Sequence, residues 1–115
     1  MQELIDNVLA WGAARNLHEP DLAPQLIKLT EELGEIAAGV ARQDSARIMD
    51  GVGDLLVVLI NFGACFADWA DYSEEETRRM RHHFLEMCLN HAWHEIRERT
   101  GKTVNGVFVK DGEVK

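Results

Sequence analysis

The chain has 115 residues, of which 46% are hydrophobic and 28% charged, a balance typical of one globular domain rather than of a disordered or fibrous protein. Twelve Lys and Arg against 20 Asp and Glu give a net charge of −8. This charge argues against binding to a nucleic-acid backbone, which needs a clustered Lys/Arg surface. The chain opens without a basic, apolar leader, so we expect a soluble cytoplasmic protein.

The two cysteines, Cys65 and Cys88, lie in apolar sequence without CxxC spacing, and we expect both to be small buried side chains. Without a disulfide framework, a reducing cytoplasm is the expected compartment. The most apolar stretch, Leu55–Ala67, is too short to span a bilayer and is interrupted by Asn61, so we expect no membrane partner.

Apolar residues recur at helical spacing over Gln2–Arg15 and again over Asp21–Arg42, with a loop at Asn16–Pro20 between them. Asp21 is a suitable N-terminal cap for the second helix. Inside this helix Gly34 costs about 1 kcal/mol relative to alanine, which predicts close approach by a neighbouring element.

The third predicted helix, Ser45–Asp68, carries six consecutive apolar residues over Leu55–Ile60. Such a helix is apolar around its whole circumference and has to be buried on every side. One short chain offers too few helices for that burial. We therefore expect a homo-oligomer, a dimer or a tetramer, built across this helix.

The fourth predicted helix starts with a capping box formed by Ser73 and Glu76, and Gly101 is expected to end it. The tail, Lys102–Lys115, predicts a short extended segment or a small hairpin. The sequence thus predicts one all-α domain over residues 1–115, an antiparallel bundle of about four helices with a short extended tail. The expected buried face of the fourth helix is Phe84, Leu85, Cys88, Leu89, Ala92, Trp93 and Ile96.

Acidic residues gather near the expected buried sides of the second and third helices. Glu31, Glu32 and Glu35 lie close together around the second helix, and Asp50 and Asp54 lie one turn apart on the third. If the two helices face each other, four or five carboxylates meet. Mg²⁺, which prefers oxygen ligands and carries substrate phosphates, would compensate their repulsion.

A plainer interpretation of the same residues is a pair of solvated acidic faces with Lys28 and Arg42 as ion-pair partners. A basic run at Arg78, Arg79 and Arg81 is likewise interpreted as a solvated face, paired with the glutamates that begin the fourth helix. The residue pattern alone leaves the metal-binding and solvated interpretations of the acidic residues open.

The order Glu31-Glu32-Leu-Gly-Glu35, followed by Gly53-Asp54 at the start of an apolar helix with Asn61, resembles the MazG-like family of all-α nucleoside triphosphate pyrophosphohydrolases. The hallmark of that family is EExxE followed, after a spacer, by ExxD. The flanking segments that also resemble small members of the family are Trp11–Leu17, Ala92–Ile96 and Gly101–Gly106.

The resemblance implies hydrolysis of nucleoside triphosphates to the monophosphate and pyrophosphate, with Mg²⁺ or Mn²⁺ as cofactor. Glu32, Glu35 and Asp54 match metal ligands, and Glu31 or Glu35 would position the attacking water as a base. The chain departs from the pattern at one position, because Gly51 stands where the glutamate of ExxD falls. The neighbouring Asp50 is the candidate replacement ligand.

Four further residues are candidates for substrate binding. Lys28 would contact a phosphate or else pair with Glu32, and Asn61 would contact the nucleoside or else bond between helices. Arg15 and Trp11 would close the site, although Trp11 is better suited to a place in the core.

Two other functions stay open. Gly51 allows a catalytically silent helical oligomer that binds nucleotide or a protein partner. The acidic pattern also fits a different metal-dependent hydrolase, one acting on diphosphates or alarmones.

Overall fold

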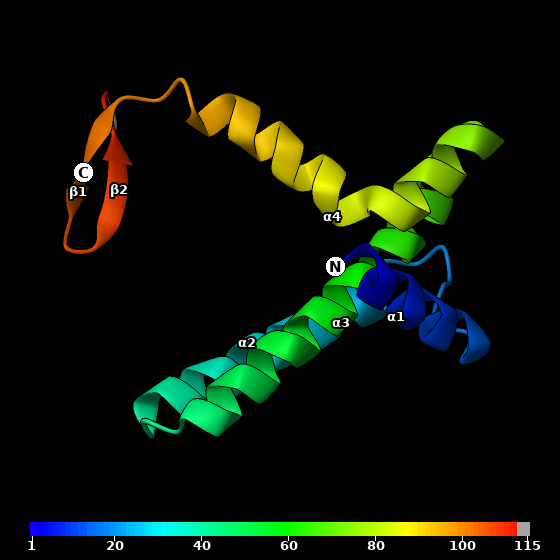
Figure 1. Cartoon of the computed structure of the whole chain (residues 1–115), viewed down its shortest axis with the longest axis horizontal. Helices are drawn as coiled ribbons and strands as arrows, with labels where there is room; N and C mark the ends of the chain where they lie inside the picture. The colour runs from blue at the N-terminus through cyan, green and yellow to red at the C-terminus, as the bar shows by residue number, and fades with distance from the viewer. Residues whose placement is uncertain (113–115) are drawn as a thin grey trace. The chain divides into compact units, whose positions relative to one another are not determined.

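The computed structural model describes residues 1–112 and divides into two compact units, Met1–Leu85 and Glu86–Lys115. The prediction of a mostly helical chain with four helices is confirmed over the described residues, and a β-hairpin follows them (Figure 1). The single-domain prediction over residues 1–115 stays a prediction. The elements are α1 (Gln2–Ala14), α2 (Ala23–Ala41), α3 (Ser45–Trp69), α4 (Glu74–Ile96), β1 (Gly101–Val104) and β2 (Val107–Lys110).

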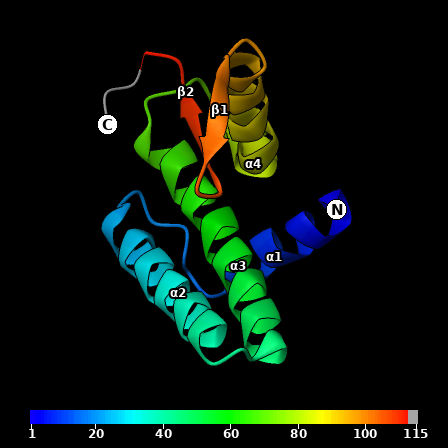
Figure 2. The same cartoon turned by 90° about the vertical axis from the view of Figure 1, so that its left-hand side faces the viewer.

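The centre of the first unit is the antiparallel pair α2 and α3, which lie side by side along their lengths (Figure 2). Asp44 caps α3, since its carboxylate accepts a hydrogen bond from the backbone N–H of Arg47 at 3.1 Å. Asp21 accepts one from the N–H of Ala23 at 3.1 Å, but the residue at the N-cap of α2 is Leu22. The expected helix boundaries are otherwise within two residues of those observed for α1, α2 and α3.

Helix α1 crosses α3 and closes a small core. Leu9 of α1 packs against Ile60 and Ala64 of α3, and the half-buried side chains around them are Ile5, Val8 and Leu85. Over residues 57–67 every residue of α3 is buried or half-buried, whereas exposed residues recur over its first half.

Helix α4 begins with the predicted capping box: the hydroxyl of Ser73 accepts from the N–H of Glu76 at 3.2 Å and donates to its carboxylate at 3.0 Å. The ring of Phe84 then packs where Gly63 leaves room on α3. Between these points the backbone of His83 is not helical (φ −125°, ψ 21°), so α4 bends there.

The prediction of a buried face along α4 is wrong for the single chain, because none of its residues is buried. Phe84 and Leu85 are half-buried, but Cys88, Ala92 and the residues around them are exposed, Leu89 by 71% and Trp93 by 53%. The 3.6-residue period does mark an apolar face here, but this period does not say what covers it.

The second unit also contains the hairpin of β1 and β2, in which Gly101 pairs with Lys110 and Val104 with Val107. Asn105 and Gly106 both have positive φ, 52° and 79°, as a two-residue type I′ turn requires. The expected small hairpin is therefore confirmed. Gly101 opens β1 and does not end α4, and the last three residues of the predicted tail lie outside the described part of the chain.

One expectation about packing needs correction. A Cβ atom built on Gly34 would meet no atom of another described element within 4 Å, so none of these elements approaches this glycine closely.

Helix α3 as a whole, with 25 residues, is long and apolar enough to cross a membrane, although the core helix of a soluble protein passes the same test. The expectation that the protein has no membrane partner stays a prediction.

Candidate functional site

A hollow of about 480 Å³ lies between α2 and α3 and holds all five acidic residues singled out from the sequence. Helix α2 contributes one lysine and three glutamates, and α3 contributes one arginine, one glycine and two aspartates. The expectation that the two acidic helices face each other is confirmed. The residues that line the hollow are Lys28, Glu31, Glu32, Glu35, Arg47, Asp50, Gly51 and Asp54.

Gly51 determines how closely the two helices approach at this hollow. It is buried, and a Cβ atom at this position would lie 2.8 Å from Cγ1 and 3.4 Å from the backbone nitrogen of Ile36 on α2. A glutamate side chain has no room there unless the helices move apart. The exposed Asp50, one residue earlier, lines the hollow instead.

Two cations pair with three of the carboxylates. Lys28 Nζ lies 3.2 Å from Glu31 Oε2 and 3.5 Å from Glu32 Oε1, and Arg47 Nη2 lies 2.9 Å from Glu35 Oε2. The partner on α3 is thus Arg47, and not Arg42 as the solvated interpretation expected. The hydrogen bond and charge of Glu31, followed by those of Glu32, raise the pKa of Lys28 above its ordinary value.

The carboxylates differ in burial. Glu32 is 8% exposed, whereas the side chains of Glu31 and Glu35 are 60% and 58% exposed. The expectation that these glutamates lie near the buried side is therefore correct for Glu32 alone. Asp50 and Asp54 are exposed and make no ion pair with the described residues.

The chemistry of these donors fits Mg²⁺, because every acidic lining residue offers carboxylate oxygens. Their present positions do not form a ligand set: among residues 1–112 no three acidic, histidine or cysteine side chains are close enough to hold one metal ion. Binding a cation would require Glu32 and Glu35 to exchange Lys28 and Arg47 for it.

Asn61 lies outside this hollow. Its side chain is 1% exposed, its Nδ2 donates to the carbonyl of Val57 at 3.0 Å, and its Oδ1 lies 2.8 Å from Nε2 of His18. Because Asn61 Oδ1 can only accept, Nε2 of His18 is the donor in that contact. The described bonds join α3 to the loop after α1, and not to another helix as the structural alternative for this residue expected.

Arg15 and Trp11 also lie outside the lining of the hollow. The guanidinium of Arg15 stacks 4.3 Å from the centre of the Trp11 ring and donates to its backbone carbonyl at 3.0 Å. Trp11 is 47% exposed, so its expected place in the core is wrong for the single chain.

Sequence reasoning did not identify Arg47 or His18. A signal for Arg47 existed, because Asp44 fixes the start of α3 and places Arg47 one turn before Gly51, on the side that faces α2. No comparable signal marked His18, whose contact with Asn61 depends on the path of a loop.

Comparisons with known proteins give one partial match. Over 62 residues, 52% of this chain, the sequence is 45% identical to the "Uncharacterized 18.2 kDa protein in rep-hol intergenic region" of Haemophilus phage HP1 (strain HP1c1). The match spans 37% of that relative, whose name states no activity. No protein-family model matches the chain, and no solved structure matches it.

Proposed function

We propose that the protein is a Mg²⁺-dependent nucleoside triphosphate pyrophosphohydrolase of the MazG-like kind, acting in the cytoplasm as a homo-oligomer. The observation that supports this proposal is the gathering of five carboxylates from two antiparallel helices around one hollow. The same residues carry the sequence resemblance, so the pattern and the hollow point to the same place.

The proposed metal ligands are Glu32, Glu35, Asp50 and Asp54. A bound Mg²⁺, or Mn²⁺ in its place, would offset the charge of the triphosphate and favour in-line attack on it. The lining carries five negative and two positive side chains, a formal charge of 2 − 5 = −3, which would repel an anionic substrate in the absence of a cation.

In this proposal, Lys28 and Arg47 exchange carboxylate partners for phosphate oxygens when a metal ion binds. In the absence of a metal ion they pair with Glu31, Glu32 and Glu35. Once a cation occupies the carboxylates, the two side chains would be free to hold phosphate oxygens. This exchange keeps the buried Glu32 paired in both states, as burial of a charge requires.

The exposed glutamates supply the base. Glu31 or Glu35 would accept a proton from a water whose oxygen attacks the α-phosphorus, and the bond from that phosphorus to the bridging oxygen would break. The products are the nucleoside monophosphate and pyrophosphate. The other candidate substrate residues, Asn61, Arg15 and Trp11, lie outside the lining of the acidic hollow. They would contact the nucleoside only if the helices around the hollow closed on the substrate or if a second subunit completed the site.

A homo-oligomer is supported by apolar side chains that the single chain leaves exposed. Leu26, Leu33 and Val40 follow each other at seven-residue spacing along α2, and each is more than half exposed. Packing of this stripe against a second copy would complete an antiparallel bundle of at least four helices. The exposed apolar residues of α3 that would join this interface are Met49, Val52 and Leu56.

The proposal is tested by measuring pyrophosphate release from a panel of nucleoside triphosphates, with and without Mg²⁺. We expect metal-dependent release with an equal amount of monophosphate. Nucleoside diphosphates and alarmones belong in the same panel, because turnover of these alone would favour the other class of hydrolase.

The competing proposal, a catalytically silent oligomer, is favoured by the ion pairs of Lys28 and Arg47, which occupy three of the five carboxylates. It predicts that a folded protein releases no pyrophosphate across the whole panel at saturating Mg²⁺. Nucleotide binding without turnover would then identify what the oligomer does.

A further inference from the structure

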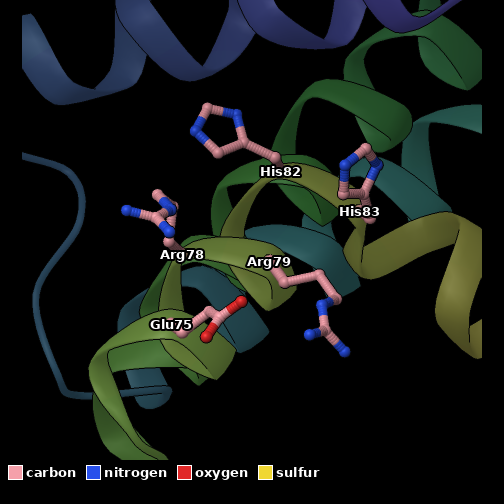
Figure 3. Close-up of a pocket in the computed structure, with 5 residues that line it drawn as sticks. All are labelled: Glu75, Arg78, Arg79, His82 and His83. Atoms are coloured by element: carbon pink, nitrogen blue, oxygen red, sulfur yellow. The ribbon is translucent and has the colours of Figure 1, made fainter.

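A second hollow, of about 290 Å³, lies on α4 near the bend and differs from the first in the sign of its charge. Its lining side chains project from consecutive turns of one stretch of the helix (Figure 3). Three of these residues follow one another at spacings of three and four residues along the helix, and the other two are their chain neighbours. The lining residues are Glu75, Arg78, Arg79, His82 and His83.

Arg78 and Arg79 of this hollow differ from Arg81 in their ion pairing. Arg78 and Arg79 make no ion pair with any of residues 1–112, although Glu75 is within one turn of both. The expectation that this basic run pairs with Glu74 and Glu75 is therefore wrong. Arg81 is the member of the run that has an acidic partner, Asp68 of α3.

This hollow is held by contacts from another helix. Nε2 of Gln2 on α1 donates to the carbonyl of His82 at 3.1 Å, and Nδ1 of His82 lies 3.5 Å from the carboxylate of Asp6. Figure 3 shows the imidazole of His82 on the side of α4 that faces α1. These contacts are at the point where His83 departs from helical geometry, so the hollow belongs to a fixed bend and not to a straight solvated face.

We propose that this hollow binds a small phosphate-bearing anion without a metal ion. The guanidinium group of each arginine offers the forked donors that phosphate oxygens accept, and the imidazole of His82 lines the same hollow. In a chain of net charge −8, Arg78 and Arg79, which form no ion pair within residues 1–112, give this hollow a local positive field that a free anion neutralises. Glu75 lines the same hollow, and Asp6 pairs with His82 beside it, so both carboxylates oppose binding of a larger anionic surface.

The test is calorimetric titration of the full chain with inorganic phosphate and with pyrophosphate in a buffer that contains a metal chelator. We expect saturable binding that weakens as salt is added. The double variant Arg78→Ala/Arg79→Ala should lose affinity by about ten-fold or more, and Arg78→Lys/Arg79→Lys should lose less, because lysine keeps the charge but not the fork.

The matched control is Arg97→Ala/Arg99→Ala, which removes two arginines from the second unit and should leave the affinity unchanged. Asp50→Asn/Asp54→Asn should also leave it unchanged, and this separates the basic hollow from the proposed catalytic one. If the alanine variant fails to fold, the resonances of His82 and His83 in the wild type should shift with added phosphate. Absence of saturable binding, or equal binding by the folded alanine variant, would overturn the proposal.

Discussion

At the scale of single residues, Gly51 explains why the acidic pattern of this chain departs from the family it resembles. The sequence shows the glycine, but it does not show that Ile36 of the opposite helix lies against it. Asp50 could be named from the sequence because it is next to Gly51 and one turn from Asp54. The pairing of Glu35 with Arg47 could not be read in this way, since it depends on the angle at which two helices cross.

Substitution of Gly51 by alanine should lower the free energy of unfolding by about 1–3 kcal/mol, because the new methyl group overpacks the contact with Ile36. Urea unfolding measures the change. The control is Gly53→Ala, two residues along the same helix, where a Cβ atom would meet nothing within 4 Å. That variant should be neutral or up to about 1 kcal/mol more stable. Equal effects of the two substitutions would contradict the close approach at Gly51.

The ion pairs of Lys28 predict a dependence of stability on alkaline pH. Since Glu31 and Glu32 raise its pKa in the folded state, its contribution is present below the ordinary value of 10.5 and is lost as pH rises through the raised value. The free energy of unfolding should thus fall less steeply above this pH in Lys28→Gln than in the wild type. Lys110→Gln, which removes a lysine without an ion pair to the described residues, should keep the wild-type slope.

At the scale of elements, the order of helices and the hairpin could be predicted because their ends carry local signals. Ser73 with Glu76 marks the start of α4, and Asn105-Gly106 marks the turn between the strands. The bend at His83 has no such signal. The exposure of the residues after it was equally hidden, because an apolar period indicates a buried face without identifying the partner that buries it.

The reactivity of the two cysteines reports which apolar faces of α3 and α4 are covered. Cys65 is 1% exposed and its Sγ donates to the carbonyl of Leu17 at 3.2 Å, while burial raises the pKa of its thiol. Cys88 is exposed in the single chain, although burial also raises the pKa of its thiol. A thiol reagent at pH 8 should therefore modify Cys88 and spare Cys65 until the protein unfolds. Peptide mass spectrometry identifies the modified cysteine. If Cys65 reacted faster than Cys88, the packing around α3 would differ from the packing described here.

At the scale of the whole molecule, a core of three buried side chains beside α1 is small for a chain with many exposed apolar residues. The sequence predicted that a single chain would leave apolar surface uncovered, because α3 is apolar around its whole circumference. It could not identify the stripe along α2 as the surface left open, since the same residues also fit packing against α3. Large exposed apolar surfaces are typical of association.

Substitution of Leu33 by glutamate should convert the oligomer to a smaller species, because it places a charge in the middle of the α2 stripe. Light scattering on a sizing column measures the mass. Arg42→Glu, at the exposed C-cap of the same helix and on the side opposite to the stripe, is the control and should keep the wild-type mass. A wild type that is monomeric at all concentrations would rule out the oligomer proposed here.

The proposed metal-dependent hydrolysis by the carboxylates between α2 and α3 is best tested by the rate of pyrophosphate release as a function of Mg²⁺ concentration. We expect a rate that saturates with Mg²⁺ in the wild type and in Asp71→Asn, a control outside the hollow. In Asp54→Asn the rate should fall by about 100-fold with the helical circular dichroism unchanged. A rate that is insensitive to Mg²⁺, or equal in Asp54→Asn and the wild type, would contradict it.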